Sequence, residues 1–239
     1  RRIIILKYIN GNKLNFEKSL CSILEKRKVQ NSKKFFLVKK ILSDVKKNQD
    51  KAIIKYEKKF SKVNKLRASN IKFSQIEIKK IISNLDKKVK NSIDLAYNRI
   101  YRFHKKQKFI SFKTKDIYNN SLSYISSPID KVGVYVPGGK ASYPSTVLMN
   151  CIPAQIAGVK KIYMTTPALN KIVNPAILYA AQKCKVSEIY KIGGAQAIAG
   201  FAYGTKIIKK VNKIVGPGND YVALAKKEGF GTGGIDMIA

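Results

Sequence analysis

Apolar residues in the first hundred positions recur at the spacing of one helix face. Ser74 followed by Glu77 has the pattern of a capping box and marks where one of these helices begins. Stripes of this kind normally form a core, so we assign them no chemistry. Three are evident: Val38, Ile41, Leu42 and Val45; Ile78, Ile81, Ile82 and Leu85; and Val89, Ile93, Ala96, Ile100 and Phe103.

The period changes after about residue 108. Two short β-rich runs come first, at 109–112 and 122–125. Apolar runs of strand length then recur, each followed by a segment long enough for a helix, which is the alternation of a doubly wound parallel sheet. Asn174-Pro175 fits the start of one such helix, with Asn as its cap. The strand runs are 132–136, 161–164, 188–192 and 211–215.

These patterns predict an α/β protein in two parts. Residues 1–127 form a helix-rich segment, which we interpret as an incomplete first domain. Residues 128–239 form a Rossmann-like domain with a doubly wound parallel sheet. At 239 residues and 45% hydrophobic content, the chain can bury a substantial core.

The net charge of +34 raises the question of a nucleic acid partner. The basic excess is almost all Lys, however, whereas recognition of phosphates and bases favours Arg. Lys is also spread along the whole chain rather than clustered beside exposed aromatic residues. We therefore interpret the charge as a generally solvated surface, and we expect no nucleic acid partner. A basic nucleic-acid-binding module stays as the alternative function.

Other classes of site and location are poorly supported. Cys21, Cys151 and Cys184 are too dispersed for a disulfide framework or a paired-cysteine metal site, and we expect buried thiols in a cytoplasmic protein. The apolar run 3–6 is too short for a signal peptide, and no stretch approaches the ~20 apolar residues of a membrane span. The single histidine, His104, is expected to be solvated or to cap a helix.

Three of the predicted strands run directly into glycine-rich turns. The carboxyl ends of parallel strands meet at one edge of the sheet, where α/β proteins bind ligands. Glycine allows a ligand to approach the backbone, and a helix that follows can offer N–H groups to a phosphate. We therefore predict a nucleotide site, although a strict G-x-G-x-x-G fingerprint is absent. The turns follow Val136, Ile192 and Val215 as Pro137-Gly138-Gly139, Gly193-Gly194 and Gly216-Pro217-Gly218.

Five blocks in this order resemble the successive motifs of histidinol dehydrogenases. The resemblance covers most of the chain from about residue 35, more loosely in its helical part. The blocks are Val132-Gly133-Val134-Tyr135-Val136-Pro137-Gly138-Gly139, Tyr143-Pro144-Ser145-Thr146-Val147-Leu148-Met149-Asn150, Gly193-Gly194-Ala195-Gln196-Ala197-Ile198-Ala199, Lys213-Ile214-Val215-Gly216-Pro217-Gly218-Asn219 and Ile235-Asp236-Met237-Ile238-Ala239.

The resemblance implies a zinc-dependent homodimer that oxidises L-histidinol through L-histidinal to L-histidine with NAD. The family's NAD contacts match Tyr135, Gln196 and Asn219, which makes residues 128–239 the NAD-binding domain. Each of the three has a simpler alternative role. Tyr135 could belong to the core, Gln196 could be an ordinary residue of a first helical turn, and Asn219 could cap its helix.

The family's zinc ligands and acid/base residues follow the last of these blocks. We therefore expect the sequence to be a C-terminally truncated piece, inactive by itself, with neither catalytic nor metal-binding residues of its own. A decayed, inactive gene product is a third possibility.

Overall fold

The computed structural model describes residues 9–61, 66–138, 143–168, 173–229, 231 and 234–236. Several residues used above lie outside these ranges, namely the apolar run 3–6, Gly139 and the block end 237–239. Within the described ranges no helix is both long enough and apolar enough to cross a membrane.

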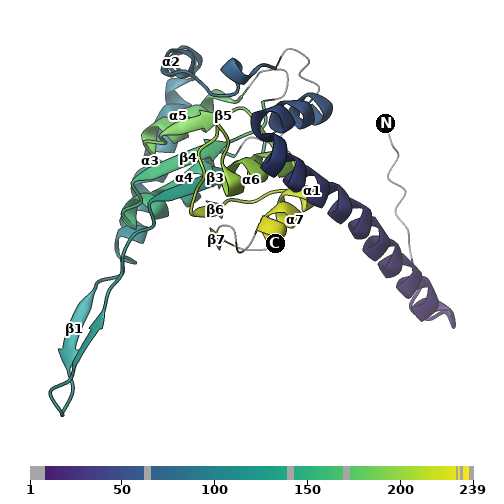
Figure 1. Cartoon of the computed structure of the whole chain (residues 1–239), viewed down its shortest axis with the longest axis horizontal. Helices are drawn as coiled ribbons and strands as arrows, with labels where there is room; N and C mark the ends of the chain where they lie inside the picture. Colours follow the sequence, from purple (N-terminus) through teal and green to yellow (C-terminus); the bar gives the residue numbers. More distant parts are fainter. Residues whose placement is uncertain are drawn as a thin grey trace.

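A five-stranded parallel sheet forms the centre of the molecule (Figure 1). Its order is β5-β4-β3-β6-β7, and every neighbouring pair is parallel. From β3 the chain winds outward to β4 and β5, and it then returns to place β6 on the other side of β3. The winding therefore reverses between β3 and β6, as in a doubly wound Rossmann-like sheet. The strands are β3 (Lys131–Tyr135), β4 (Lys161–Thr165), β5 (Glu188–Tyr190), β6 (Lys213–Val215) and β7 (Gly234–Ile235).

Helices cover both faces of this sheet, as the alternating pattern predicts. One layer holds α4 (Pro144–Ile156) and α5 (Pro175–Lys183), against which α2 (Gln75–Ser83) and α3 (Lys87–Lys105) pack. The opposite layer holds α6 (Gly194–Tyr203), α7 (Asp220–Gly229) and the long α1 (Phe16–Ser61), which is kinked at Gln49. A short 3-10 turn, η1 (Ala68–Asn70), lies between α1 and α2.

Two predicted helix starts are confirmed. The Ser74 hydroxyl accepts a hydrogen bond from the backbone N–H of Glu77 at 3.1 Å. The Glu77 carboxylate binds the Lys191 ammonium at 2.6 Å. The Glu77 side chain therefore links α2 to the residue that follows β5. Asn174 caps α5 by accepting from the N–H of Ala176 at 2.8 Å, with Pro175 in the first turn.

The helical segment before residue 128 contributes to both hydrophobic cores of the sheet. Residues of α1 pack with α6 and α7 on one side, and residues of α2 and α3 pack with α4 and α5 on the other. The stripe from Val38 to Val45 is fully buried, as expected. In the α3 stripe Ile93 is buried, but Val89 is 38% exposed and Phe103 is 62% exposed, so the core does not cover the two ends of the stripe. The division into two parts at residue 127 stays a prediction.

The β-rich runs form an antiparallel hairpin of β1 (Phe112–Lys115) and β2 (Ser121–Tyr124), which projects from the body of the molecule (Figure 1). The first strand begins at Phe112, three residues later than predicted. Asp116 fixes the turn by accepting from the N–H groups of Tyr118 and Asn120, and the resulting register pairs Phe112 with Tyr124. Residues 109–111 lie outside this ladder.

The cysteines and the histidine give a mixed outcome. Cys151 and Cys184 are buried free thiols, as expected, but Cys21 is exposed because the first turns of α1 extend beyond the layer of α6 and α7. His104 lies in the last turn of α3, where its Nδ1 is 2.6 Å from the Gln107 side chain. That position fits the solvated or capping role that we predicted.

Candidate cofactor site

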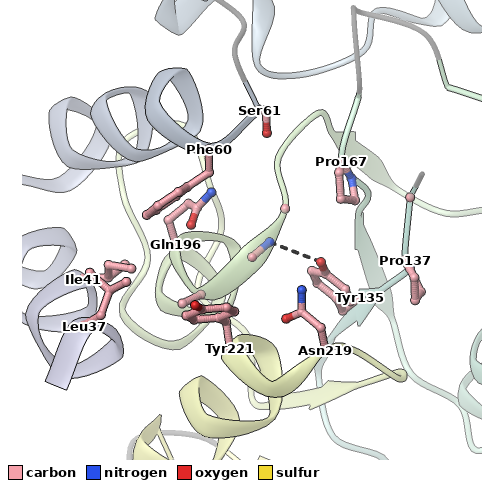
Figure 2. Close-up of a pocket in the computed structure, with 14 residues that line it drawn as sticks. Leu37, Ile41, Phe60, Ser61, Tyr135, Pro137, Pro167, Gln196, Asn219 and Tyr221 are labelled. Carbon is pink, nitrogen blue, oxygen red and sulfur yellow. Dashed lines mark hydrogen bonds between the residues drawn. The ribbon is translucent and has the colours of Figure 1, made fainter. Parts of the chain in front are cut away.

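A cavity of about 430 Å³ lies at the carboxyl edge of the sheet, beside the point where the winding reverses. Tyr135, Gln196 and Asn219 all line it, so the structure brings the three predicted residues together (Figure 2). The glycine turns contribute Gly138, Gly193 and Gly194 to the same lining. Open α/β sheets bind their ligands in this location.

Tyr135 is the last residue of β3 and is only 4% exposed. Its hydroxyl oxygen accepts a hydrogen bond from the Gly194 N–H at 3.2 Å, the dashed line in Figure 2. Burial raises the pKa of the Tyr135 hydroxyl. The phenol therefore keeps its proton at neutral pH, and with the oxygen already accepting, it can donate that proton to a ligand.

Gln196 lies in the first turn of α6 and is 2% exposed. Its Nε2 donates to the Glu57 carboxylate at 2.8 Å, and its Oε1 is buried with no hydrogen-bond partner among the described residues. Glu57 comes from the last turns of α1 and is 1% exposed. It also accepts from the Gly193 N–H at 3.2 Å and from the Ser61 hydroxyl. Burial raises the pKa of Glu57, while these three donors oppose the rise.

The start of α6 differs from the anion site that the sequence suggests. The N–H of Gly193 is bonded to the Glu57 carboxylate, and the N–H of Gly194 is bonded to the Tyr135 hydroxyl. Groups of the protein therefore occupy the first two amides, and the negative charge that a helix start favours is supplied internally.

Asn219 immediately precedes α7, and its Oδ1 accepts from the N–H of Val222 at 3.2 Å. The capping role that we considered for this residue is therefore present. Since Oδ1 is used in the cap, the Nδ2 hydrogens are the part of the amide that can donate elsewhere. Asn219 is exposed at the mouth of the cavity, so capping and ligand contact are compatible.

An ion pair between a buried lysine and a partly exposed aspartate holds the turn that precedes Asn219. Lys226 of α7 is 3% exposed, and its ammonium donates to the Gly216 carbonyl and to Asp236. Asp236 also accepts from the Gly216 N–H at 2.7 Å. Gly216 itself has φ +105, and a Cβ there would overlap the Tyr135 carbonyl oxygen. The turn from β6 to α7 is thus fixed against the end of β3.

The remaining wall of the cavity is apolar and comes from α1 and α7. Leu37, Ile41 and Phe60 of α1 lie opposite the glycine turns, and Tyr221 of α7 lies beside them (Figure 2). An apolar wall with a few placed polar groups is typical of a cofactor pocket. Among the described residues, no group of three His, Cys, Asp or Glu side chains could hold a metal ion.

Comparison with known proteins identifies the family to which the chain belongs. The family model described as histidinol dehydrogenase matches residues 24–239. The chain belongs to the histidinol dehydrogenase family. This result favours an oxidoreductase, as the five sequence blocks indicated, and gives no support to the nucleic-acid-binding alternative.

Curated histidinol dehydrogenases align over nearly the whole chain. The one from Pelagibacter ubique is 54% identical over 236 residues, which is 98% of this chain and 54% of the relative. The one from Clostridium acetobutylicum is 44% identical over the same length, again 54% of the relative. The chain therefore spans about half the length of the curated relatives that it matches.

A solved structure supports the same assignment. The crystal structure of histidinol dehydrogenase from Elizabethkingia anophelis has a TM-score of 0.81 to this chain at 40% sequence identity. The match covers 85% of this chain and 47% of that one. The α/β architecture with its parallel sheet is therefore that of the family.

Proposed function

We propose that this chain supplies the NAD-binding half of an enzyme that oxidises L-histidinol, through L-histidinal, to L-histidine. The observation that carries the proposal is the meeting of Tyr135, Gln196 and Asn219 around one cavity at the switch point of the sheet. The family membership supports the choice of reaction.

NAD fits the residues that are present. Gln196 Oε1 is a buried acceptor in need of a donor, which the hydroxyl, amine and carboxamide groups of NAD can supply. Tyr135 and Asn219 would hold the cofactor by donating from the phenol and the amide, while Phe60 and Tyr221 provide apolar contact. When bound, NAD supplies the acceptor for the hydride that leaves the substrate. The residues of this chain bind and orient it.

The chemical step and the metal are assigned to other residues. The described residues offer no zinc ligand set, so we derive no step through zinc. We propose that the zinc ligands and acid/base groups come from the part of the family that this chain does not cover. The same proposal includes a cytoplasmic location and a homodimer, as the family resemblance implies.

Calorimetric titration of the 239-residue chain with NAD tests the cofactor assignment directly. We expect saturable binding that Gln196→Met weakens, since Met keeps the length of the side chain and removes both amide atoms. Met149→Gln provides a control, because Met149 is exposed on α4 and does not line this cavity. Equal affinity in parent and Gln196→Met would remove Gln196 from the cofactor site.

A chimera tests the enzymatic function. Residues 1–239 can replace the aligned half of the Pelagibacter ubique relative, to which the chain is 54% identical. We expect histidinol-dependent reduction of NAD, followed as absorbance of NADH. A well-folded chimera that binds NAD but is inactive with histidinol would contradict the proposed substrate.

A further inference from the structure

The strongest feature that the proposed function leaves unexplained is Glu57. It is buried, it belongs to a helix far away in sequence, and it lies against the start of α6, where an α/β protein would often hold a phosphate. Three donors converge on it, from Gln196, Gly193 and Ser61.

The orientation of the Gln196 amide follows from this contact. An ionised carboxylate only accepts hydrogen bonds, so the amide must turn its Nε2 hydrogens toward Glu57. Its Oε1 then lies on the other side, where it is buried and where no described residue bonds to it. Leaving such an acceptor unpaired is costly, and a ligand donor would remove that cost.

The charge of Glu57 has a second effect at the same place. The Gly193 amide, which could bind an anion, is bonded to Glu57 instead. A ligand phosphate at this corner would meet a negative carboxylate in a buried setting, where repulsion is weakly screened.

We propose that Glu57 is a positioning residue that makes the α6 corner of the cavity a subsite for a neutral, donor-bearing group rather than for phosphate. Glu57 fixes the Gln196 amide, and Gln196 Oε1 accepts from an amine, carboxamide or hydroxyl group of the ligand. The proposal rests on the proposed function in taking NAD as that ligand.

Glu57→Gln tests the proposal, because it removes the charge and keeps the size. A neutral amide oxygen holds the Gln196 amide less firmly than a carboxylate does, because charge-assisted hydrogen bonds are the stronger ones. We therefore expect NAD affinity to fall about two- to tenfold, the value of one hydrogen bond. Affinity for inorganic pyrophosphate, titrated separately, should stay unchanged or increase. Opposite or unequal responses to the two probes are the signature of positioning, since a damaged cavity would bind both less well.

Asp50→Asn is the matched control. Asp50 is also an α1 carboxylate, and it accepts from the Thr205 hydroxyl just beyond α6, away from the cavity. It therefore ties the same two helices without touching Gln196. If Asp50→Asn weakened NAD as much as Glu57→Gln does, the effect would come from loosening α1, and the proposal would be wrong.

Nuclear magnetic resonance of the ligand-free chain separates this proposal from the proposed function. The Gln196 side-chain amide should give one pair of slowly exchanging signals that Glu57→Gln shifts or splits. A parent that shows this pair but does not bind NAD would overturn the proposed function and leave the positioning role intact. A parent that binds NAD, with affinity and amide signals unchanged in Glu57→Gln, would overturn the positioning role alone.

Discussion

The buried Lys226 ammonium pairs with the partly exposed Asp236 carboxylate at 2.6 Å, and both side chains bind the backbone of Gly216. Removal of Asp236 leaves the Lys226 ammonium buried without its charged partner, whereas removal of Lys226 leaves a carboxylate that water can reach. We expect Asp236→Ala to lower the free energy of unfolding by about 3 kcal/mol, because the buried Lys226 ammonium loses its charged partner. Lys226→Met should cost about 1–3 kcal/mol, because the Gly216 carbonyl and Asp236 lose their donor but no buried ammonium is left unpaired.

Urea unfolding of the two single variants and the double variant measures this coupling. The double variant should lose less than the sum of the single losses, since no lone charge then stays buried. Strictly additive losses would show that the two side chains do not act as a pair.

Gly216→Ala should be strongly destabilising. Gly216 combines a positive φ with a Cβ position that overlaps the Tyr135 carbonyl, and together these effects should cost about 3 kcal/mol or more. Gly231→Ala is a matched control, because Gly231 also has a positive φ, +95, but no atom of the described part of the chain lies within 4 Å of its Cβ position. We expect it to cost about 1 kcal/mol. Equal melting temperatures for the two variants would disprove the steric part of this explanation.

Asn219 should reveal two separable roles. Asn219→Ala removes the cap of α7, at a cost on the order of 1 kcal/mol, and should lower NAD affinity by up to about tenfold. Asn219→Asp keeps the capping oxygen but brings a negative charge to the mouth of the cavity, so the melting temperature should hold while NAD binding falls. Thermal melts and NAD titrations of both variants measure this. Should Asn219→Asp bind NAD as tightly as the parent, the residue would be a cap alone.

The buried Glu57 should make stability depend on pH. Its pKa in the folded chain is raised above the ordinary value of 4.5, chiefly by burial, so the folded state takes up its proton more readily than the unfolded state. The stability that this group contributes is full below pH 4.5 and is lost as the pH rises through the folded pKa. Glu57→Gln does not titrate. The parent should therefore lose stability relative to Glu57→Gln as the pH rises above 4.5, in denaturant titrations at a series of pH values. A constant difference would contradict the raised pKa.

The parts of this structure that sequence could predict are those with local causes. Ser74 and Asn174 cap their helices because a short polar side chain beside the first turn has one favourable partner nearby. The positions of the glycine turns could be predicted because each apolar run has the length of a strand and because glycine adopts the backbone conformations that tight turns need. From these local signals and the family resemblance, we predicted that Tyr135, Gln196 and Asn219 belong to one site. All three line the same cavity.

Glu57 and Lys226 could not be predicted in this way. An acidic residue on a lysine-rich helix is ordinarily solvated, and the partner that buries Glu57 lies 139 positions further along the chain. Lys226 is followed directly by Lys227, and nothing local distinguishes the buried lysine from its neighbour. The exposure of Phe103 could not be predicted either, because the apolar pattern of α3 does not show how far the core that buries Ile93 extends along the helix.

The reversal of winding between β3 and β6 also bears on how this site can be transplanted. Its wall is assembled from α1, the ends of β3 and β5, and the starts of α6 and α7, which meet only when the whole sheet is wound. Moving only the three glycine turns to another scaffold would transfer the turns without the helices and strand ends that form the rest of the cavity wall. Recombination within this family should therefore keep residues 37–236 as one inherited block, because Lys226 and Asp236 hold the Gly216 turn beside the cavity.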